Sequence, residues 1–376
     1  MAPMPRKPSA GDLLQLIREA GPLSRTDLSR QSGLAASTVS LRVEELVRSG
    51  LVEEIGDGES KGGRRPRLLR ASSGSGVALA ADLGTHHARL AVVDLAGQRL
   101  AADEVEIRFD DGPAAALEVV SARLAEMAAG QRVLGVGAGL PGPVDPVAGQ
   151  IVSPSRMPGW HGMRVRSWLE DRFGVPAMVD NDANLLALGE YRSRWANTDV
   201  RDLVAVKVGR GIGCGIVAGG VVHHGANGAA GDISHVRVVG ADSVLCGCGR
   251  RGCLETVASG AALLEQLGLS STTELVAQVH RGDAAANQAV RGAGWYLGEV
   301  LAVVVNFFNP QVLVIGGSLS AADPLIASLR AAIYERCLPM ASEAVRITAV
   351  SDGLEAGVTG AAWLILDHLA ETATAV

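Results

Sequence analysis

Hydrophobic and polar positions follow a helical period through the first fifty residues of the chain. Residues 12–20 place leucine and isoleucine on one face of a predicted helix, which a Gly-Pro pair ends. A second helix is predicted over residues 24–32 and a third over residues 37–48, because Ser24 and Ser37 are suitable N-caps. The buried face of the third helix would consist of Val39, Val43, Leu46 and Val47.

Two short helices separated by a glycine turn form a helix-turn-helix unit, and residues 52–69 add a β-hairpin that would be its wing. The third helix presents small polar and basic side chains outward, which suits base edges and phosphates. The residues of this helix expected to contact DNA are Ser37, Thr38, Ser40 and Arg42. At the wing tip, Arg64 and Arg65 would reach the negative potential of a narrow, A·T-rich minor groove.

The distribution of charge indicates an anionic partner for this region alone. Residues 1–72 carry a formal net charge of +3 and the remaining residues carry −9, for a total of −6. The basic stretch at 61–70 could instead be a solvated linker, and the three helices could be a simple packing module. A packing module does not explain a basic Gly-Arg-Arg-Pro tip beside the third helix, so we favour DNA binding.

From Val77 onward strands alternate with helices, which indicates an α/β class. The predicted strands of the first half lie at 77–82, 88–94, 99–108 and 133–140, and the predicted helix lies at 114–129. Ala-Asp-Leu-Gly at 81–84 and Lys-Val-Gly at 207–209 occupy equivalent places in two similar patterns, which suggests an internal repeat. A duplicated half predicts two lobes around a cleft, where a ligand would bind.

Three of the five cysteines fall within one short segment, and a histidine precedes them. These four residues are His235, Cys246, Cys248 and Cys253. A cytoplasmic protein gains little from disulfides, so clustered cysteines with a nearby histidine indicate a metal site. Three thiolates and one imidazole are typical of a closed, tetrahedral structural zinc site. The alternatives are a redox pair or an accidental cluster.

With these motifs, the chain resembles the ROK family of repressors, open reading frames and kinases, in the subgroup of bacterial regulators with an N-terminal winged helix-turn-helix. The cysteine cluster followed by Glu255 is the most specific match. The other matching motifs are Gly-Gly-Arg-Arg-Pro at 62–66, Asp-Leu-Gly at 82–84, Gly-Leu-Pro-Gly-Pro-Val-Asp at 139–145, Asn-Asp-Ala-Asn at 181–184, Gly-Arg-Gly-Ile-Gly at 209–213, Gly-Asp-Ile-Ser-His at 231–235 and Val-Ile-Gly-Gly at 314–317. The resemblance covers nearly the whole chain. It implies an actin-like, ribonuclease-H-like fold of two lobes, with sugar in the cleft and oligomers built through this domain.

The resemblance carries a sugar site over to named positions. In the kinases, the Asp of the Asn-Asp pair takes the proton from the sugar hydroxyl; here it is Asp182, with Asn181 beside it for another hydroxyl. Asp232 stands where the kinases have the longer Glu. His235 would bind zinc through one ring nitrogen and sugar through the other. Glu255 would accept from hydroxyls near the anomeric carbon.

The phosphate half of the site departs from the family pattern. The kinases carry Asp-x-Gly-Gly-Thr-Lys, whereas residues 82–87 are Asp-Leu-Gly-Thr-His-His. Their second loop, Gly-Thr-Gly, is Gly-Arg-Gly at 209–211. The Cβ of Thr85 blocks the close approach to a phosphate that glycine permits. We expect no ATP binding and no enzymatic activity, with Asp182 a vestigial base, although Arg210 could still hold an anion.

The sequence therefore predicts a sugar-responsive transcriptional regulator of the repressor type. Its domains would be a winged helix-turn-helix at 1–72 and a ROK effector-binding and oligomerisation domain at 73–376, with one structural Zn²⁺ per chain. We expect a homodimer or homotetramer that reads an inverted repeat in double-stranded DNA, with a sugar or sugar phosphate as effector. The alternative is a sugar kinase with a DNA-binding appendage.

The chain contains no apolar run of the roughly 20 residues that a membrane helix needs. Its first residues are basic and proline-rich and lack the apolar centre of a signal peptide. We therefore expect a cytoplasmic protein with no membrane partner.

Overall fold

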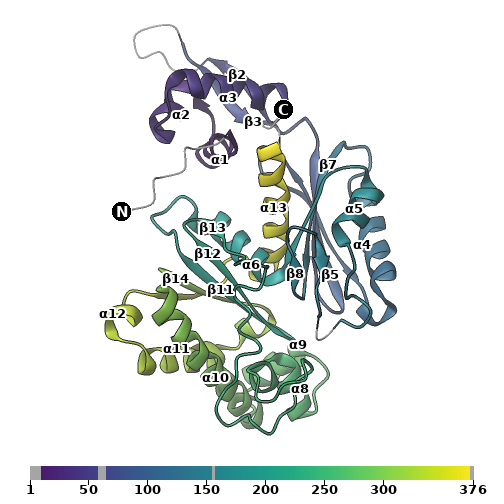
Figure 1. Cartoon of the computed structure of the whole chain (residues 1–376), viewed down its shortest axis with the longest axis vertical. Coiled ribbons are helices and arrows are strands. Elements are labelled where there is room, and N and C mark those ends of the chain that lie inside the picture. The colour runs from purple at the N-terminus through teal and green to yellow at the C-terminus, as the bar shows by residue number, and fades with distance from the viewer. Residues whose placement is uncertain (1–9, 58–64, 155–156, 373–376) are drawn as a thin grey trace.

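The computed structural model describes residues 10–57, 65–154 and 157–372, which form a small N-terminal domain above a two-lobed body (Figure 1). The N-terminal domain packs its helices around a sheet of strand order β1-β3-β2. Its elements are α1 (Ala10–Ala20), β1 (Leu23–Ser24), α2 (Arg25–Ser32), α3 (Ala36–Arg48), β2 (Val52–Asp57) and β3 (Arg67–Ala71). The predicted helix-turn-helix and the two wing strands are confirmed, whereas the wing tip, Arg64 included, lies outside the described residues.

The start of α2 is explained by its local sequence. The Ser24 hydroxyl accepts from the Asp27 amide at 3.1 Å, and the Asp27 carboxylate accepts from the Ser24 amide at 3.2 Å. This reciprocal capping box satisfies two amides that the first turn leaves without helical partners. Gly33 then ends the helix in the left-handed conformation that glycine adopts without strain.

The prediction for the third helix is wrong at its first turn. The helix begins at Ala36 and its N-cap, Ala35, makes no side-chain capping bond. Ser37 is therefore the second residue of α3, exposed to solvent, and does not cap it. Val47 is 37% exposed, whereas the other three predicted core residues of α3 are fully buried.

Two five-stranded sheets of the same topology form the body. Their strand orders are β10-β7-β4-β5-β6 and β13-β12-β11-β14-β15. In each sheet, the central strand pairs antiparallel with the next strand along the chain and parallel with a later one. The internal repeat suggested by the sequence is thus a duplicated sheet, and the two-lobed α/β class is confirmed.

The strands of the first sheet are β4 (Val77–Leu83), β5 (His87–Asp94), β6 (Arg99–Glu106), β7 (Val133–Leu140) and β10 (Ala177–Asn181). Those of the second are β11 (Leu203–Val208), β12 (Ile212–Ala218), β13 (Val221–Val222), β14 (Val312–Gly316) and β15 (Arg346–Ala349), and a small ladder joins β8 (Val144–Asp145) to β9 (Gln150–Ile151). The first-lobe strands and helix predicted from the sequence lie within two residues of their observed bounds.

The helices of the body are α4 (Pro113–Met127), α5 (Val165–Phe173), α6 (Asp182–Glu190), α7 (Glu255–Ala258), α8 (Gly260–Leu267), α9 (Thr272–His280), α10 (Ala284–Phe308), α11 (Asp323–Arg336), α12 (Pro339–Ser342) and α13 (Ala356–Thr372). Short helical turns are the 3₁₀ segments η1 (Phe109–Asp111), η3 (Ser318–Ala321) and η4 (Gly353–Glu355) and the π-helical segment η2 (Tyr191–Trp195). None of the helices in the described ranges combines the length and apolar character that a membrane crossing requires.

Two helices, α6 and α13, lie between the sheets, and their backbones touch. Every residue of α6 is buried; Leu185 and Leu188 pack toward the first sheet, while Leu186 and Ala187 pack toward the second. A Cβ on Gly360 of α13 would overlap the Leu185 carbonyl oxygen. Only glycine permits this separation, so the contact fixes how the two lobes meet.

The N-terminal domain docks on α13, which extends toward it from between the lobes (Figure 1). Residues of α1, α3 and β3 share one hydrophobic core with the first sheet and α13. Arg18 of α1 donates to the Leu95 carbonyl at 2.7 Å and lies 5.6 Å from the Trp363 ring centroid. Arg192 lies on the same ring at 5.7 Å and pairs with Asp367 at 2.7 Å. Burial lowers the pKa of Arg18 to about 10, so the guanidinium stays charged near neutral pH.

The contact between α6 and α13 generates a stability prediction. We expect Gly360→Ala to lower the free energy of unfolding by about 3 kcal/mol or to prevent folding, because the new methyl group meets backbone atoms. Gly292→Ala is the matched control, since Gly292 lies in α10 with no atom within 4 Å of its added Cβ. That change should be neutral or slightly stabilising. Urea unfolding of both variants tests this; equal stabilities would contradict the packing described.

Candidate functional site

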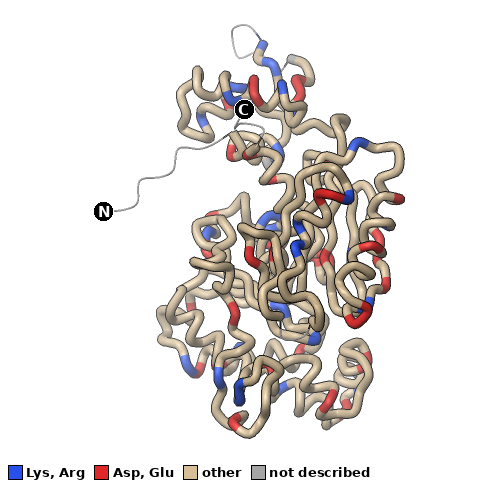
Figure 2. Tube along the Cα trace, turned by 45° about the vertical axis from the view of Figure 1, so that its right-hand side comes forward, with Lys and Arg blue, Asp and Glu red and all other residues tan. Residues whose placement is uncertain are grey.

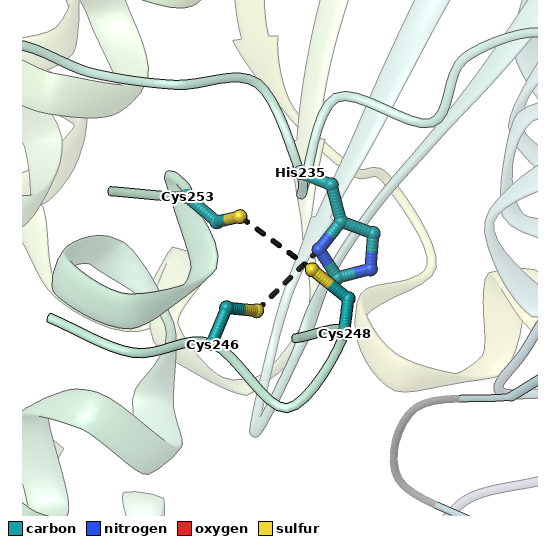
Figure 3. Close-up of side chains that lie close together, drawn as sticks. All are labelled: His235, Cys246, Cys248 and Cys253. Carbon is teal, nitrogen blue, oxygen red and sulfur yellow. Dashed lines mark hydrogen bonds between the residues drawn. The ribbon is translucent and has the colours of Figure 1, made fainter. Parts of the chain in front are cut away.

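A histidine and three cysteines converge in the loop between β13 and α7 (Figure 3). Their four ligand atoms lie within 4.8 Å of one another. The loop folds back on itself through the Cys246 amide, which donates to the Arg250 carbonyl at 2.7 Å. Gly249 and Gly252 adopt positive φ angles of 84° and 75°, which allow the tight turns between the cysteines.

The spacing of these donors fits a tetrahedral ion. His235 Nδ1 lies 3.6 Å from Cys246 Sγ, and Cys248 Sγ lies 3.7 Å from Cys253 Sγ. With metal–sulfur and metal–nitrogen bonds of about 2.3 and 2.0 Å, tetrahedral neighbours would be separated by about 3.8 Å (S to S) and about 3.6 Å (S to N). Burial raises the pKa of the Cys253 thiol to about 12. A bound divalent cation would reverse that shift because it binds the thiolate. The cluster can therefore hold a metal ion.

Three charged side chains meet where the two lobes join: Asp82 at the end of β4, Asp182 at the start of α6, and Lys207 in β11. Lys207 Nζ donates to Asp182 Oδ2 at 2.8 Å and lies 3.5 Å from Asp82 Oδ2. We call these three residues the ion-pair triad. Both carboxylates are buried, with 5% of Asp82 and 9% of Asp182 exposed.

The pKa shifts in the triad follow from burial and charge. Burial alone would lower the pKa of the Lys207 ammonium, but the two carboxylates outweigh it and raise that pKa. Burial raises the pKa of Asp182, while the ammonium of Lys207 opposes this shift. The lysine is therefore charged at neutral pH, and its charge opposes the rise in the pKa of Asp182.

Glu255 and His235 lie near the hairpin formed by β11 and β12, and β11 contains Lys207 of the triad. Glu255 is 5% exposed and its amide donates to the Ser234 carbonyl at 2.9 Å, which places it next to the metal cluster. A Cβ on Gly211 would lie 3.1 Å from Glu255 Oε1, and one on Gly213 would lie 3.9 Å from Asp182 Oδ1. Because side chains two residues apart in an extended segment point to the same face, Glu255 and Asp182 both approach one face of the chain at Gly211 and Gly213.

The remaining predicted sugar contacts, Asn181 and Asp232, occupy different settings. Asn181 is the N-cap of α6: its Oδ1 accepts from the Ala183 amide and its Nδ2 donates to the Gly142 carbonyl, both at 2.9 Å. Asn181 rather than Asp182 therefore caps α6, and its amide keeps one donor and one acceptor for another partner. Asp232 is exposed, and it accepts from the Ser234 hydroxyl at 2.7 Å.

The phosphate-loop positions form tight turns. The Gly84 amide donates to the His87 carbonyl at 2.8 Å and closes the β4–β5 turn around Thr85. In the second loop, Arg210 is exposed, and the backbone of Gly209 touches the N-terminus of α8. A cavity of about 370 Å³ lies elsewhere, beside α13 and η2, and none of the predicted site residues line it.

Two polar features at this junction escaped prediction from the sequence. In the sequence, Lys207 was noted only as part of the internal repeat. Its equivalence to Asp82 in that repeat is the signal that could have identified it. Asp180 is buried and accepts from His224 Nε2 at 2.6 Å and from Asn184 Nδ2 at 2.9 Å. That hydrogen bond with Asp180 raises the pKa of His224. Asn184 is close to Asp180 in sequence, whereas only the tertiary fold brings His224 to Asp180.

The N-terminal domain carries both basic and acidic residues along its chain (Figure 2). On α3, Ser37 is exposed, whereas Thr38, Ser40 and Arg42 are half-buried. The exposed face of the helix also contains Leu41, at 59% exposure, which sequence reasoning did not select. Arg65 is exposed at the base of the wing tip.

Acidic residues of β2 neutralise part of the basic wing. Glu54 accepts from Arg25 at 2.9 Å and from Arg67 at 2.5 Å, and these two bonds lower the pKa of Glu54. Glu53 pairs with Arg70 at 2.6 Å. Of the described arginines in the basic stretch, Arg67 and Arg70 thus form ion pairs with glutamates of the same domain. The positive charge that remains for DNA therefore lies toward the tip of the wing.

Comparison with known proteins adds family and function to this geometry. The family model "ROK family" matches residues 78–368, and a model for winged helix-turn-helix DNA-binding domains matches residues 9–53. The xylose repressor of Bacillus subtilis (strain 168) is 28% identical over 96% of each chain. The DNA-binding transcriptional dual regulator NagC of Escherichia coli (strain K12) is 31% identical over 83% of this chain and 80% of its own.

Solved structures agree with these relatives. A ROK family transcriptional regulator, a homologue of the E. coli MLC protein, superposes with a TM-score of 0.81 at 28% identity, covering 97% of this chain and 98% of its own. A ROK family glucokinase from Streptomyces griseus, in complex with glucose and AMPPNP, superposes with a TM-score of 0.67 at 29% identity, covering 77% of this chain and 99% of its own. The kinase therefore matches the body without the N-terminal domain. The chain belongs to the ROK family and carries the winged helix-turn-helix of its transcriptional regulators.

Proposed function

We propose that the protein is a cytoplasmic transcriptional repressor whose affinity for operator DNA changes when a sugar binds at the lobe junction. The observation that carries this proposal is the position of α13. Its first turn meets the ion-pair triad, because a Cβ on Gly357 would overlap the Asp82 carboxylate. Its C-terminal half shares a hydrophobic core with the helix-turn-helix. A shift of α13 relative to the triad would therefore reposition the DNA-binding domain.

The chemistry of the junction suits an uncharged polyol. Asp182 and Glu255 offer acceptors, Asn181 keeps a donor and an acceptor, and His235 turns its Nδ1 toward the cysteines, which leaves Nε2 for a hydroxyl. Each sugar hydroxyl both donates and accepts, so such a mixture matches it. The xylose and N-acetylglucosamine named for the relatives define the first sugars to test.

The runner-up is a sugar kinase with a DNA-binding appendage. Asp182 and Glu255 favour it, as does the likeness of the body to a glucokinase. Thr85 and Arg210 weigh against it because they alter both loops that would hold ATP phosphates. Lys207 weighs against it as well, since its ammonium already pairs with the candidate base.

We place the domain boundary in the segment between β3 and β4, so that the N-terminal domain comprises residues 1–72 and the body residues 73–376.

We assign one structural Zn²⁺ per chain to the metal site. Three cysteines and a histidine leave no open coordination position, which is typical of structural rather than catalytic zinc. Bound zinc would also fix the ring of His235, whose other nitrogen faces the proposed sugar.

For DNA, we propose a homodimer or homotetramer that binds an inverted repeat, with α3 in the major groove and the wing in the flanking minor groove. Exposed apolar residues on adjoining helices of the second lobe support assembly through this lobe. They are Val303, Phe307, Tyr334, Leu338 and Met340.

The zinc assignment predicts a defined loss. Protein purified without chelator should contain one zinc per chain by elemental analysis, and Cys248→Ser should lose it and unfold at a lower temperature. Cys337→Ser is the control, because that cysteine is buried away from the cluster and should leave the zinc content unchanged. Wild-type protein without zinc would contradict the assignment.

The regulatory proposal is tested by comparing sugar binding with DNA binding. D-xylose, D-glucose or N-acetyl-D-glucosamine should raise the thermal midpoint of the wild type and change its affinity for an operator selected from random duplexes. Asp182→Ala should weaken sugar binding at least about tenfold, because it removes a buried acceptor, and should retain DNA binding in the absence of sugar. Asp171→Ala, an exposed change on α5, is the control. ATP-dependent phosphorylation of any of these sugars would instead support the kinase alternative.

The wing makes a separate prediction. Arg64→Ala with Arg65→Ala should weaken operator binding and reduce the slope of log affinity against log salt by about 1 to 2 per protomer, because fewer counterions are released. Fluorescence anisotropy over a series of salt concentrations measures the slope. Arg281→Ala, far from the N-terminal domain in sequence and fold, should leave it unchanged. An unaltered slope in the wing variant would remove the wing from the interface.

A further inference from the structure

The internal repeat places opposite charges at equivalent positions of the two sheets. Asp82 in β4 and Lys207 in β11 each stand two residues before the glycine that follows the strand. Each is also paired in register with a glycine of the parallel neighbour, Gly139 for Asp82 and Gly316 for Lys207. The pseudo-symmetry of the lobes therefore brings a carboxylate and an ammonium face to face, 3.5 Å apart.

Lys207 is unusual in the composition of the body. The sequence contains three lysines, and the other two, Lys7 and Lys61, precede residue 73. All other cationic side chains of the body apart from its histidines are arginines. An arginine guanidinium is planar and broad, whereas the lysine ammonium is a compact point charge with three donors. The junction thus holds a compact cation between two buried carboxylates.

The two carboxylates need that cation. Asp82 and Asp182 come from different elements, both are buried, and Lys207 contacts both carboxylates. Asp82 Oδ1 has no hydrogen-bond partner among the described residues, and α13 closes over this carboxylate at Gly357. Arg89, opposite Asp82 on β5, is directed to Glu104 at 2.9 Å and to Glu355 at 3.8 Å. Lys207 is therefore the group that balances the pair.

We propose that Lys207 is a positioning residue of the sugar site. Its ammonium acts as a resident cation, that is, a cation supplied by the chain itself, and joins Asp82 and Asp182 across the two lobes. It thereby presents Asp182 as an ionised acceptor for a sugar hydroxyl. This inference rests on the proposed function. The ammonium engages Asp182 Oδ2, whereas Oδ1 lies toward Gly213 and the side of the hairpin that Glu255 occupies. Oδ1 can then accept from a hydroxyl while a free ammonium hydrogen donates to the same or a neighbouring oxygen.

The ammonium of Lys207 would also take the place of a bound cation. Two buried carboxylates this close would otherwise attract a divalent metal ion, for which carboxylate oxygens are preferred ligands. The lysine occupies that place permanently. Removing it should expose an empty cation site, which an added cation of suitable size can fill.

The test uses the full-length protein with Lys207→Met and Lys207→Ala. We expect both to lower the thermal midpoint by about 5 °C, since removal of one partner leaves buried charge uncompensated. Both should bind the sugar that the wild type binds at least about tenfold more weakly. Millimolar ethylammonium should restore the midpoint and the sugar affinity of Lys207→Ala, while ethanol, of similar size and uncharged, should not. Mn²⁺ should raise the midpoint of Lys207→Ala and not that of the wild type.

Arg192→Met is the matched control, because it breaks a half-buried ion pair outside the junction. It should lose stability without losing sugar affinity and without rescue by ethylammonium. If Lys207→Ala does not fold, Lys207→Met combined with Asp82→Asn removes the ammonium and one carboxylate together, and it should fold but still bind sugar weakly.

Two results would overturn the proposal: normal sugar affinity in Lys207→Met, or equal rescue by ethanol and ethylammonium, which would reduce Lys207 to a space-filling role. If the wild type binds none of the three sugars, the proposed function fails. The rescue of thermal stability by ethylammonium and Mn²⁺ still decides whether Lys207 is a resident cation, since it needs no sugar.

Discussion

The backbone contact between α6 and α13 determines how the two lobes are positioned relative to each other. Each helix begins at the lobe junction, α6 with Asp182 and α13 beside Asp82, and each is buried between the two sheets. Close-packed interiors transmit displacement because they have few voids to absorb it. The glycines at this contact therefore determine the distance between the carboxylates, and through it the geometry that a ligand would meet.

The cluster of His235 and the three cysteines adjoins the same lobe junction. The loop that carries His235 and the cysteines has little regular secondary structure, and much of its surface is exposed, so its own apolar burial is small. A tetrahedral ion would supply the cross-link that such a segment cannot obtain from packing. Glu255 lies two residues after Cys253, so an ion that fixed the loop would also fix one wall of the proposed sugar site. The helices and a bound metal would then constrain the same junction.

Much of this architecture could be predicted from the sequence because it depends on local signals. Ser24 and Asp27 form a capping box by spacing alone, and the cysteine spacing predicts a cluster that tertiary structure does close. The start of α3 was not predicted correctly, because the helix begins at Ala36 without a side-chain cap although Ser37 is a favourable cap residue. The triad was missed because Asp82, Asp182 and Lys207 are distant in sequence and meet only when the two lobes come together.

The core shared by α1 and α13 has a thermodynamic consequence. A DNA-binding domain joined by a flexible linker would open and close by local fluctuations of low free energy. Here, releasing the helix-turn-helix exposes apolar residues of α13 and breaks the buried hydrogen bond from Arg18 to Leu95. The amide protons of α1 should consequently exchange with solvent at rates close to those of the first lobe, as parts of one cooperative unit. We therefore expect the N-terminal domain and the first lobe to unfold together.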